Sequence, residues 1–277
     1  MSQIKLMYIT NDPQVAQIAE KAGVDRIFID LEYIGKSERQ GGMDTVQNHH
    51  TITDVKKIKN IVTNAKIMAR VNPIHDKSEN FSSSEFEIDG VIDAGADIVM
   101  LPYFKTSGEV ERFVKAVAGR ARTLLLFETP EAIENIDEIL EVEGIDEVFI
   151  GLNDLSLGYG HKFMFKPLAD GTVENVIGKF KSKNIPYGFG GIASLGRGML
   201  PSEKIIGEHV RLGSTCVILS RSFCNTNIVD NLDVTKTIFK DGIKQIREYE
   251  KYCRRQDEKF LSDNKNTLKR IVDEICR

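Results

Sequence analysis

The sequence predicts an α/β protein, a (β/α)8 barrel (TIM barrel) with additional C-terminal helices. Short β-branched or apolar runs alternate with segments of helical periodicity, which is the pattern of βαβ units and a parallel sheet. Eight such runs occur, and 277 residues is the usual size of one barrel of this type. We expect a catalytic barrel domain over residues 1–230 and a helical extension over residues 231–277.

The eight predicted strands are the apolar runs between the helical segments. They cover Ile4–Ile9, Arg26–Asp30, Lys66–Val71, Asp97–Leu101, Thr123–Phe127, Glu147–Ile150, Pro186–Phe189 and Cys216–Leu219. A doubly wound open sheet would have strands of the same local pattern, but such sheets more often carry a glycine-rich phosphate loop after the first strand. The corresponding segment here, TNDPQ, contains no glycine, which favours the closed barrel.

Helical periodicity marks the connections, because apolar residues recur three and four positions apart. The predicted helices are Pro13–Ala22, Thr53–Val62, Phe86–Ala94, Gly108–Ala118 and Ala132–Val142, followed in the extension by Val234–Arg254 and Gln256–Cys276. Four helix-to-strand joints contain a glycine suited to a left-handed helix end. The extension could cap the bottom of the barrel or dock on a neighbouring subunit, and we favour the second.

Composition excludes several classes of partner. Hydrophobic residues make up 41% and charged residues 28%, as in globular proteins, and the net charge is −4. No Lys/Arg block interleaved with aromatic residues is present, so we expect no nucleic-acid partner. No secretory signal or long apolar run is found either, so we expect a cytoplasmic protein without a membrane partner. The four cysteines form no CxxC pair, which predicts reduced thiols in packing positions.

Polar residues stand at the predicted carboxyl ends of several strands, where the reacting groups of a (β/α)8 barrel lie. Glu128 directly follows one apolar strand, and Asp154 follows the next through a short loop. Two carboxylates on neighbouring strand ends make a hard-oxygen site suited to Mg²⁺ or Mn²⁺. The alternative is that Asp154 caps a helix and Glu128 is a solvated loop acid.

Arg70 ends the third predicted strand, which aims its guanidinium at the barrel mouth. A two-point grip on a substrate carboxylate or phosphate is one use of such an arginine. An internal salt bridge to Asp30, Glu32 or Glu128 is the other interpretation. We assign substrate binding to five residues at these strand ends. They are Arg70, Asp30, Glu32, Asn153 and Pro102.

The central segment Leu124–Gly160, LLLFETPEAIENIDEILEVEGIDEVFIGLNDLSLGYG, resembles the signature region of the HpcH/HpaI aldolase and citrate lyase family. FIDLEY, ARVNP and DAGADIVMLP match further blocks of the family in the right order, so the resemblance covers about Phe28–Gly160. The resemblance implies that Glu128 and Asp154 bind a divalent metal, with Mg²⁺ as first choice and Mn²⁺ or Co²⁺ as alternatives. It implies that Arg70 binds a 2-oxo acid such as pyruvate and stabilises its enolate. It also implies an aldehyde or other acceptor and a trimeric or hexameric homo-oligomer.

The acid–base residue departs from the family pattern, which has a histidine where this chain has Tyr33. The following loop, IGKSERQGGMDTVQNHH, ends in His49 and His50. One of these histidines could fold into the mouth and act as the base, or both could lie on the surface. Tyr33 could donate a hydrogen bond to the substrate or merely pack.

Two glycine-rich or basic segments could contact the substrate. Lys36, Arg39 and Gln40 could bind an anionic acceptor or simply be solvated. The segment GFGGIASLGRGML, with Gly190, Gly191, Gly196 and Gly198, could hold an anion, act as a lid or form a plain turn.

Three functions remain open at this point. The first is a metal-dependent lyase of the aldolase type that acts on a 2-oxo acid. The second is related enolate chemistry on phosphoenolpyruvate or an acyl-CoA, to which the replacement of the family histidine by Tyr33 adds weight. The third is a barrel that only binds a ligand, against which the set of Glu128, Asp154 and Arg70 argues.

Overall fold

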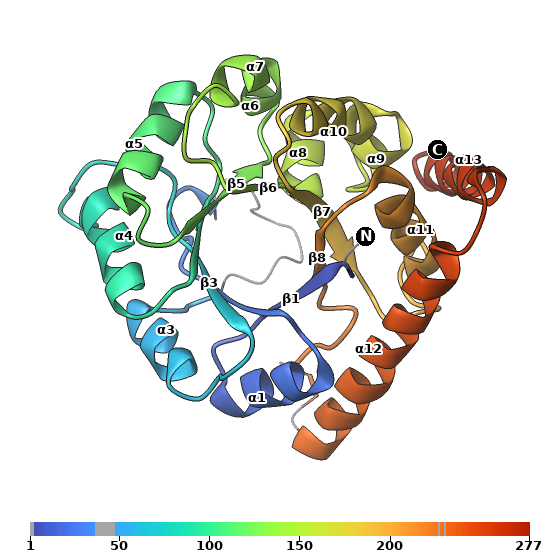
Figure 1. Ribbon diagram of the computed structural model, residues 1–277, viewed down its shortest axis with the longest axis horizontal. Coiled ribbons are helices and arrows are strands. Elements are labelled where there is room, and N and C mark those ends of the chain that lie inside the picture. The colour runs from blue at the N-terminus through green and yellow to red at the C-terminus, as the bar shows by residue number, and fades with distance from the viewer. Residues whose placement is uncertain (1–2, 37–47, 227, 230) are drawn as a thin grey trace.

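Eight parallel strands form a closed barrel in sequential order, as the sequence predicts. The computed structural model describes residues 3–36, 48–226, 228–229 and 231–277. The strands are β1 (Lys5–Ile9), β2 (Arg26–Asp30), β3 (Lys66–Arg70), β4 (Ile98–Leu101), β5 (Arg122–Phe127), β6 (Glu147–Ile150), β7 (Tyr187–Ile192) and β8 (Cys216–Leu219). Figure 1 shows the strands enclosed by a ring of helices.

The helices follow the strands around the barrel. They are α1 (Pro13–Ala22), α3 (Ile52–Lys59), α4 (Ser84–Asp93), α5 (Ser107–Val117), α6 (Pro130–Glu134), α7 (Ile136–Ile139), α8 (Leu152–Gly158), α9 (Lys166–Ala169), α10 (Thr172–Ser182), α11 (Ser202–Leu212), α12 (Leu232–Cys253) and α13 (Glu258–Ile275). The single helix predicted over Ala132–Val142 is instead two short helices, because the chain leaves helical geometry at Asn135. The glycines of the four joints, Gly23, Gly95, Gly144 and Gly213, all have positive φ.

Strand β7 is longer than the sequence predicts. It continues to Ile192 and includes Gly190 and Gly191, which we had expected in the following loop. The pairing of β7 with β8 shifts register between Gly188 and Gly191, so one or more residues bulge out of the ladder. An alternation of apolar and polar residues cannot reveal a strand segment made of glycines, because glycine has no side chain to alternate.

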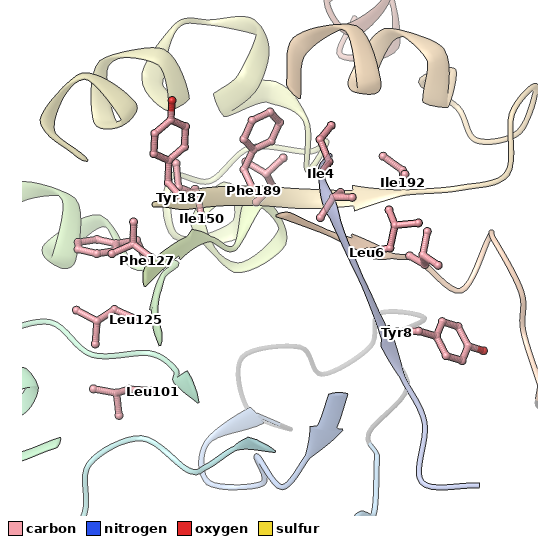
Figure 2. Packing of buried hydrophobic residues seen from close by; sticks show 14 of the residues in the cluster. Ile4, Leu6, Tyr8, Leu101, Leu125, Phe127, Ile150, Tyr187, Phe189 and Ile192 are labelled. Carbon is pink, nitrogen blue, oxygen red and sulfur yellow. The ribbon is translucent and has the colours of Figure 1, made fainter. Parts of the chain in front are cut away.

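Two hydrophobic cores lie on the two faces of the barrel wall, because successive strand residues point to opposite sides. The interior core contains Met7, Phe28, Met68, Ile98, Met100, Leu124, Leu126, Phe149 and Cys216. The larger outer core lies between the strands and the helices, and Figure 2 shows part of it, including Leu125, Phe127 and Phe189. The interior is therefore packed, and a cavity opens at the carboxyl ends of the strands.

The amino ends of the strands are closed by an ion pair inside the barrel. Arg26 begins β2 and donates from Nη2 to Glu147 Oε2 at 2.7 Å, and Glu147 begins β6 on another part of the wall. Both side chains are at most 4% exposed. This end of the barrel holds one positive and one negative group in direct contact.

The C-terminal extension packs on the chain's own barrel. Helix α12 lies against α1 and α11, and α13 lies against α11 and α9 (Figure 1). Glu250 of α12 accepts a hydrogen bond from the Ile4 backbone N–H at 2.9 Å, and Asp273 of α13 pairs with Lys166 at 2.8 Å. The inner faces of both helices are thus buried within one chain, and assembly into a trimer or hexamer stays a prediction.

Two further expectations concern the thiols and membrane spans. All four cysteines are free thiols, and three of them are buried, in agreement with packing positions. Within the described ranges, no helix has the length and apolar character needed to cross a membrane.

Candidate active site at the carboxyl ends of the strands

A cavity of about 820 Å³ opens at the carboxyl ends of the strands. Six of the ten residues that the sequence assigns to the site line it. They are Asp30, His50, Arg70, Glu128, Asn153 and Asp154. The other four, Glu32, Tyr33, His49 and Pro102, do not line it, so direct substrate contact by these four is not supported. Two of the four contact lining residues: Glu32 lies beside Arg70, and Tyr33 binds the backbone of His50.

Asp30 organises one side of the cavity. It is the last residue of β2 and pairs in register with Arg70, the last residue of β3, so both side chains leave adjacent strands on the same face. Asp30 is fully buried, and its Oδ2 accepts hydrogen bonds from Arg70, Lys36 and Asn48 at 2.8 to 2.9 Å. Burial alone would raise the pKa of this carboxyl, but Arg70 and then Lys36 hold it well below its usual range. Asp30 is therefore ionised at neutral pH.

Arg70 is held by two carboxylates at once. Its Nε donates to Asp30 Oδ1 at 2.8 Å, its Nη2 donates to Asp30 Oδ2 at 2.8 Å, and Nη2 lies 3.3 Å from Glu32 Oε2. The guanidinium also lies 5.5 Å from the centroid of the Phe28 ring. Although burial favours the neutral form, Asp30 and Glu32 raise the pKa of Arg70. The internal salt bridge is thus present, and the 13% of the side chain that stays exposed faces a ligand cavity.

Lys36 is neither solvated nor free to bind an anionic acceptor, the two possibilities that the sequence left open. It is buried, lines the cavity, and places Nζ 2.8 Å from Asp30 and 3.5 Å from Glu32. It therefore neutralises this acidic pair instead of reaching outward. Arg39 and Gln40, named with it above, lie outside the described residues. Asn48, which the sequence reasoning missed, also lines the cavity and binds Asp30.

The two histidines differ in burial and in access to the cavity. His50 is 6% exposed and lines the cavity, whereas His49 is exposed and stacks on Tyr33 with a centroid distance of 6.0 Å. Tyr33 donates from its hydroxyl to the His50 carbonyl oxygen at 2.6 Å. Thr51 follows as the N-cap of α3. Tyr33 thus anchors the segment that carries His50, and only His50 is positioned to meet a ligand.

Glu128 stands where β5 ends. Strand β5 ends at Phe127, Thr129 caps α6 and Pro130 opens it, so Glu128 lies at the rim between the strand and the helix. Glu128 is 3% exposed, which excludes a solvated loop acid. Its Oε1 accepts from the Tyr103 N–H at 3.1 Å, and Tyr103 has a positive φ of 50°. A strained backbone turn after β4 therefore helps to hold this carboxylate.

Gly151 makes room for Glu128. A Cβ at this position would lie 2.7 Å from Glu128 Oε2 and 2.8 Å from Glu128 Cβ, closer than real Cβ atoms approach other groups. The glycine is therefore required by the carboxylate beside it and not by its own backbone, whose φ is −82°. The sequence predicts only a short loop before Asp154 here, because Glu128, the neighbour that needs the space, is far from Gly151 in sequence.

Asp154 lies in the first turn of α8, after β6. The N-cap of that helix is Gly151, so Asp154 is not the helix cap that the alternative interpretation required. It is 8% exposed and lines the cavity together with Asn153. The alternative interpretations of Glu128 and Asp154 as a solvated loop acid and a cap both fail, and two buried carboxylates line the same cavity.

Charge balance bears on whether a metal fits here. Asp30, Glu32, Glu128 and Asp154 are four carboxylates, whereas Lys36 and Arg70 are two cations. When all are ionised, these six groups carry two excess negative charges, which one divalent cation would neutralise. In the described part of the chain, no three His, Cys, Asp or Glu side chains converge as a metal-binding group. A metal bound by Glu128 and Asp154 would therefore need water or substrate oxygens as its other ligands.

The opposite wall of the cavity is polar but mostly uncharged. It comes from the end of β1, the end of β8 and the start of α12. Its uncharged polar members include Thr10, Asn11, Ser220, Ser222, Asn225 and Thr235, and Asp12 and Arg221 add one charge of each sign. Sequence reasoning missed this wall, because hydroxyl and amide side chains are common in any loop. Their position directly after two predicted strands is the signal that could have found them.

The glycine-rich segment contributes two residues to the cavity. Gly190 and Gly191 line it, and a Cβ at Gly190 would lie 2.7 Å from Leu152 Cδ1. Gly190 also has a φ of 53°, so a larger residue there would be strained in two ways. Gly196 and Gly198 do not line the cavity. The close approach of β7 to α8 accounts for Gly190 without an anion.

Comparison with known proteins places the chain in a family. The model of the HpcH/HpaI aldolase/citrate lyase family matches residues 3–169. A 2-keto-3-deoxy-L-rhamnonate aldolase of Klebsiella pneumoniae subsp. pneumoniae is 26% identical over 174 residues, which cover 58% of this chain and 63% of that protein. A protein of the same name from Escherichia coli O1:K1 is 26% identical over 171 residues, 57% of this chain and 63% of that protein. The matches thus span less than two thirds of these relatives.

Solved structures share the fold at low sequence identity. An HpcH/HpaI aldolase from Desulfitobacterium hafniense DCB-2 aligns with a TM-score of 0.59 and 16% identity, covering 84% of this chain and 93% of that one. The citrate synthase SbnG aligns with a TM-score of 0.59 and 17% identity, covering 85% and 94%. The structural matches support the barrel, and the family model covers more than half of the chain. The protein therefore belongs to the HpcH/HpaI aldolase/citrate lyase family.

Proposed function

We propose that the protein is a metal-dependent carbon–carbon lyase of the aldolase type that acts on a 2-oxo acid such as pyruvate. The observation that carries this proposal is the meeting of Glu128, Asp154 and Arg70 at one cavity. Two buried carboxylates after β5 and β6 and one guanidinium at the end of β3 suit a substrate that carries a carboxylate and gains further negative charge during the reaction. Family membership and the names of the curated relatives support the same class of reaction.

Glu128 and Asp154 are the residues that would hold the metal. The excess of two negative charges among the buried groups, and their hard oxygen donors, fit Mg²⁺, with Mn²⁺ or Co²⁺ as alternatives. When bound, a divalent cation supplies Lewis-acid polarisation of the 2-oxo acid. The protein's part at Glu128 is to keep this carboxylate in place, through the Tyr103 N–H and the space left at Gly151.

Arg70 supplies fixed positive charge next to the reacting oxygens. Nε and Nη2 are engaged by Asp30, and Nη1 has no hydrogen-bonding partner among the described residues. A guanidinium pre-oriented in this way does not have to reorganise when negative charge develops on the substrate. Asp30 and Glu32 therefore act through Arg70, as positioning residues.

The remaining cavity provides space for the acceptor. A 2-oxo acid beside Glu128 and Asp154 fills only part of a cavity of about 820 Å³. The wall formed by the ends of β1 and β8 offers hydroxyl and amide groups to an aldehyde with polar substituents. We place the aldehyde or other acceptor against this wall.

The test is exchange of the C3 protons of pyruvate for deuterium, measured by NMR in deuterated water. Chelator-stripped protein should be inactive, and Mg²⁺ or Mn²⁺ should restore exchange. Glu128→Gln and Asp154→Asn should each lower the exchange rate by at least about 10²-fold, because a charged ligand becomes neutral at unchanged size. Glu131→Gln is the matched control, since this acid lies near Glu128 in sequence but pairs with Lys105 outside the cavity.

Either of two results contradicts the proposal. Metal-independent exchange would remove the role of the metal. Absence of exchange with Mg²⁺ or Mn²⁺ bound would remove the pyruvate-type substrate, and phosphoenolpyruvate or a CoA thioester would be tried next.

A further inference from the structure

His50 is the one imidazole of the described residues that lines the cavity, and its ring geometry defines what it can do. Accepting the proposed 2-oxo acid chemistry, we propose that His50 serves as a neutral hydrogen-bond donor, through Nε2–H, to a substrate oxygen that gains negative charge. It does not act as the base that we considered from the sequence. The argument rests on the atoms that surround the ring.

The first step concerns the tautomer. The backbone N–H of Asp30 donates to His50 Nδ1 at 3.0 Å. A backbone amide can only donate, so Nδ1 must present its lone pair and carry no proton. In a neutral imidazole, the single N–H is then at Nε2. The ring nitrogen available to a ligand already carries a proton and has no lone pair to accept another.

The second step concerns how firmly this arrangement is held. His50 is 6% exposed, its carbonyl oxygen accepts from the Tyr33 hydroxyl at 2.6 Å, and the next residue caps α3. Asn48 binds Asp30, the same residue whose amide holds the ring. No hydrogen-bonding partner for Nε2 is found in the described part of the chain, while the residue lines the cavity. The donor is thus pre-positioned and unsatisfied within the described protein.

The third step concerns charge. Burial lowers the pKa of His50, and this effect outweighs the opposing influence of Asp30 and Asp54. Lys36 and His49 add to the lowering. Within the described residues, these four groups lie on β2, in the segment after it, directly before the ring and on α3. The ring therefore stays neutral near pH 7 and keeps one donor and one acceptor.

The chemistry that follows is consistent with such a donor. When a C3–H bond of pyruvate breaks, the electron pair moves to the C2 oxygen and the proton passes to water. When the C3–C4 bond of an aldol product breaks, the electron pair of that bond moves toward the same oxygen, and the C4 hydroxyl loses its proton to water as it becomes a carbonyl. In both cases negative charge accumulates on an oxygen that Nε2–H can stabilise without transferring its own proton.

Paired substitutions separate a donor from a base. In His50→Gln the amide N–H₂ reaches the place of Nε2–H, but an amide cannot take up a proton near pH 7. In His50→Asn the shorter amide can replace only Nδ1. We expect His50→Gln to retain pyruvate C3 exchange within about tenfold, and His50→Asn and His50→Ala to lose about 10²–10³-fold. His49→Gln is the control and should match the wild type.

Equal loss in His50→Gln and His50→Asn would overturn the donor role and restore the base. A second measurement needs no substrate: ¹⁵N NMR of the imidazole in the intact protein. We expect nitrogen shifts of the Nε2–H tautomer, unchanged across about pH 7 to 8, because burial lowers the pKa of His50. An Nδ1–H or doubly protonated ring would overturn the inference even if activity were present. If instead the proposed function is wrong, the wild type will show no pyruvate exchange although His50 has the Nε2–H tautomer.

Discussion

The two ends of β2 hold buried ion pairs of different character. At the amino end, Arg26 meets Glu147, one cation against one anion, with little exposed surface. At the carboxyl end, Asp30 meets Arg70 and Lys36, and three further carboxylates lie nearby. The strand is five residues long, so both arrangements depend on the same piece of backbone. They differ in charge balance and in access to a cavity.

This difference separates structural from functional charge. A balanced ion pair without a cavity can stabilise or specify packing at the amino ends of the strands, but it leaves no net charge to bind a ligand. Two excess negative charges buried beside a cavity lower the stability of the folded protein unless the positive charge of a bound cation neutralises them. The charge excess at the carboxyl end of β2 therefore indicates a ligand site. The balanced pair at the amino end shows what a purely structural ion pair looks like in the same barrel.

The largest expected effect is on the stability of the protein when the Arg26–Glu147 pair is broken. Arg26→Met or Glu147→Met alone should reduce the free energy of unfolding by about 3–5 kcal/mol, because each leaves a buried charge without its partner. The double variant should lose much less, since no charge remains. Denaturant unfolding of all three measures this. Single variants as stable as the wild type would show that the pair is not buried as described.

The next effect concerns the space beside Glu128. Gly151→Ala should displace the Glu128 carboxylate and lower pyruvate exchange by about 10²-fold, the typical cost of misplacing a catalytic group by about 1 Å. Gly178→Ala is the matched control: its Cβ meets nothing within 4 Å in α10. It should leave exchange unchanged and stabilise the helix by about 0.5–1 kcal/mol. Full exchange in Gly151→Ala would show that Glu128 can move without consequence.

The smallest expected effect is a slope with pH. Because the pKa of Asp30 is lowered in the folded protein, the unfolded chain binds its proton first as pH falls. The stabilisation is therefore complete above the unfolded pKa of about 3.9 and is lost below it. Unfolding measured between about pH 5 and pH 3 should show a shallower decline in Asp30→Asn than in the wild type. Equal slopes would contradict the lowered pKa.

The fold could be predicted closely because its signals are local. Each strand is an apolar run, each helix has its own period, and glycines mark the joints with positive φ. Where the local signal was absent the prediction failed, as in the glycine-containing end of β7 and the break of the helix at Asn135. The tail helices were found from periodicity, but which neighbours they pack against could not be.

The sequence alone determined which residues stand at the strand ends, and hence that Arg70, Glu128 and Asp154 meet at one mouth. That result follows from periodicity and from the parallel arrangement of strands. Tertiary structure alone decided how these residues are engaged. The register of β2 with β3 put Arg70 on Asp30, the ion pair with Asp30 put Lys36 inside, and a backbone amide fixed the tautomer of His50. These contacts join residues that are far apart in sequence, so no local periodicity in the sequence can predict them.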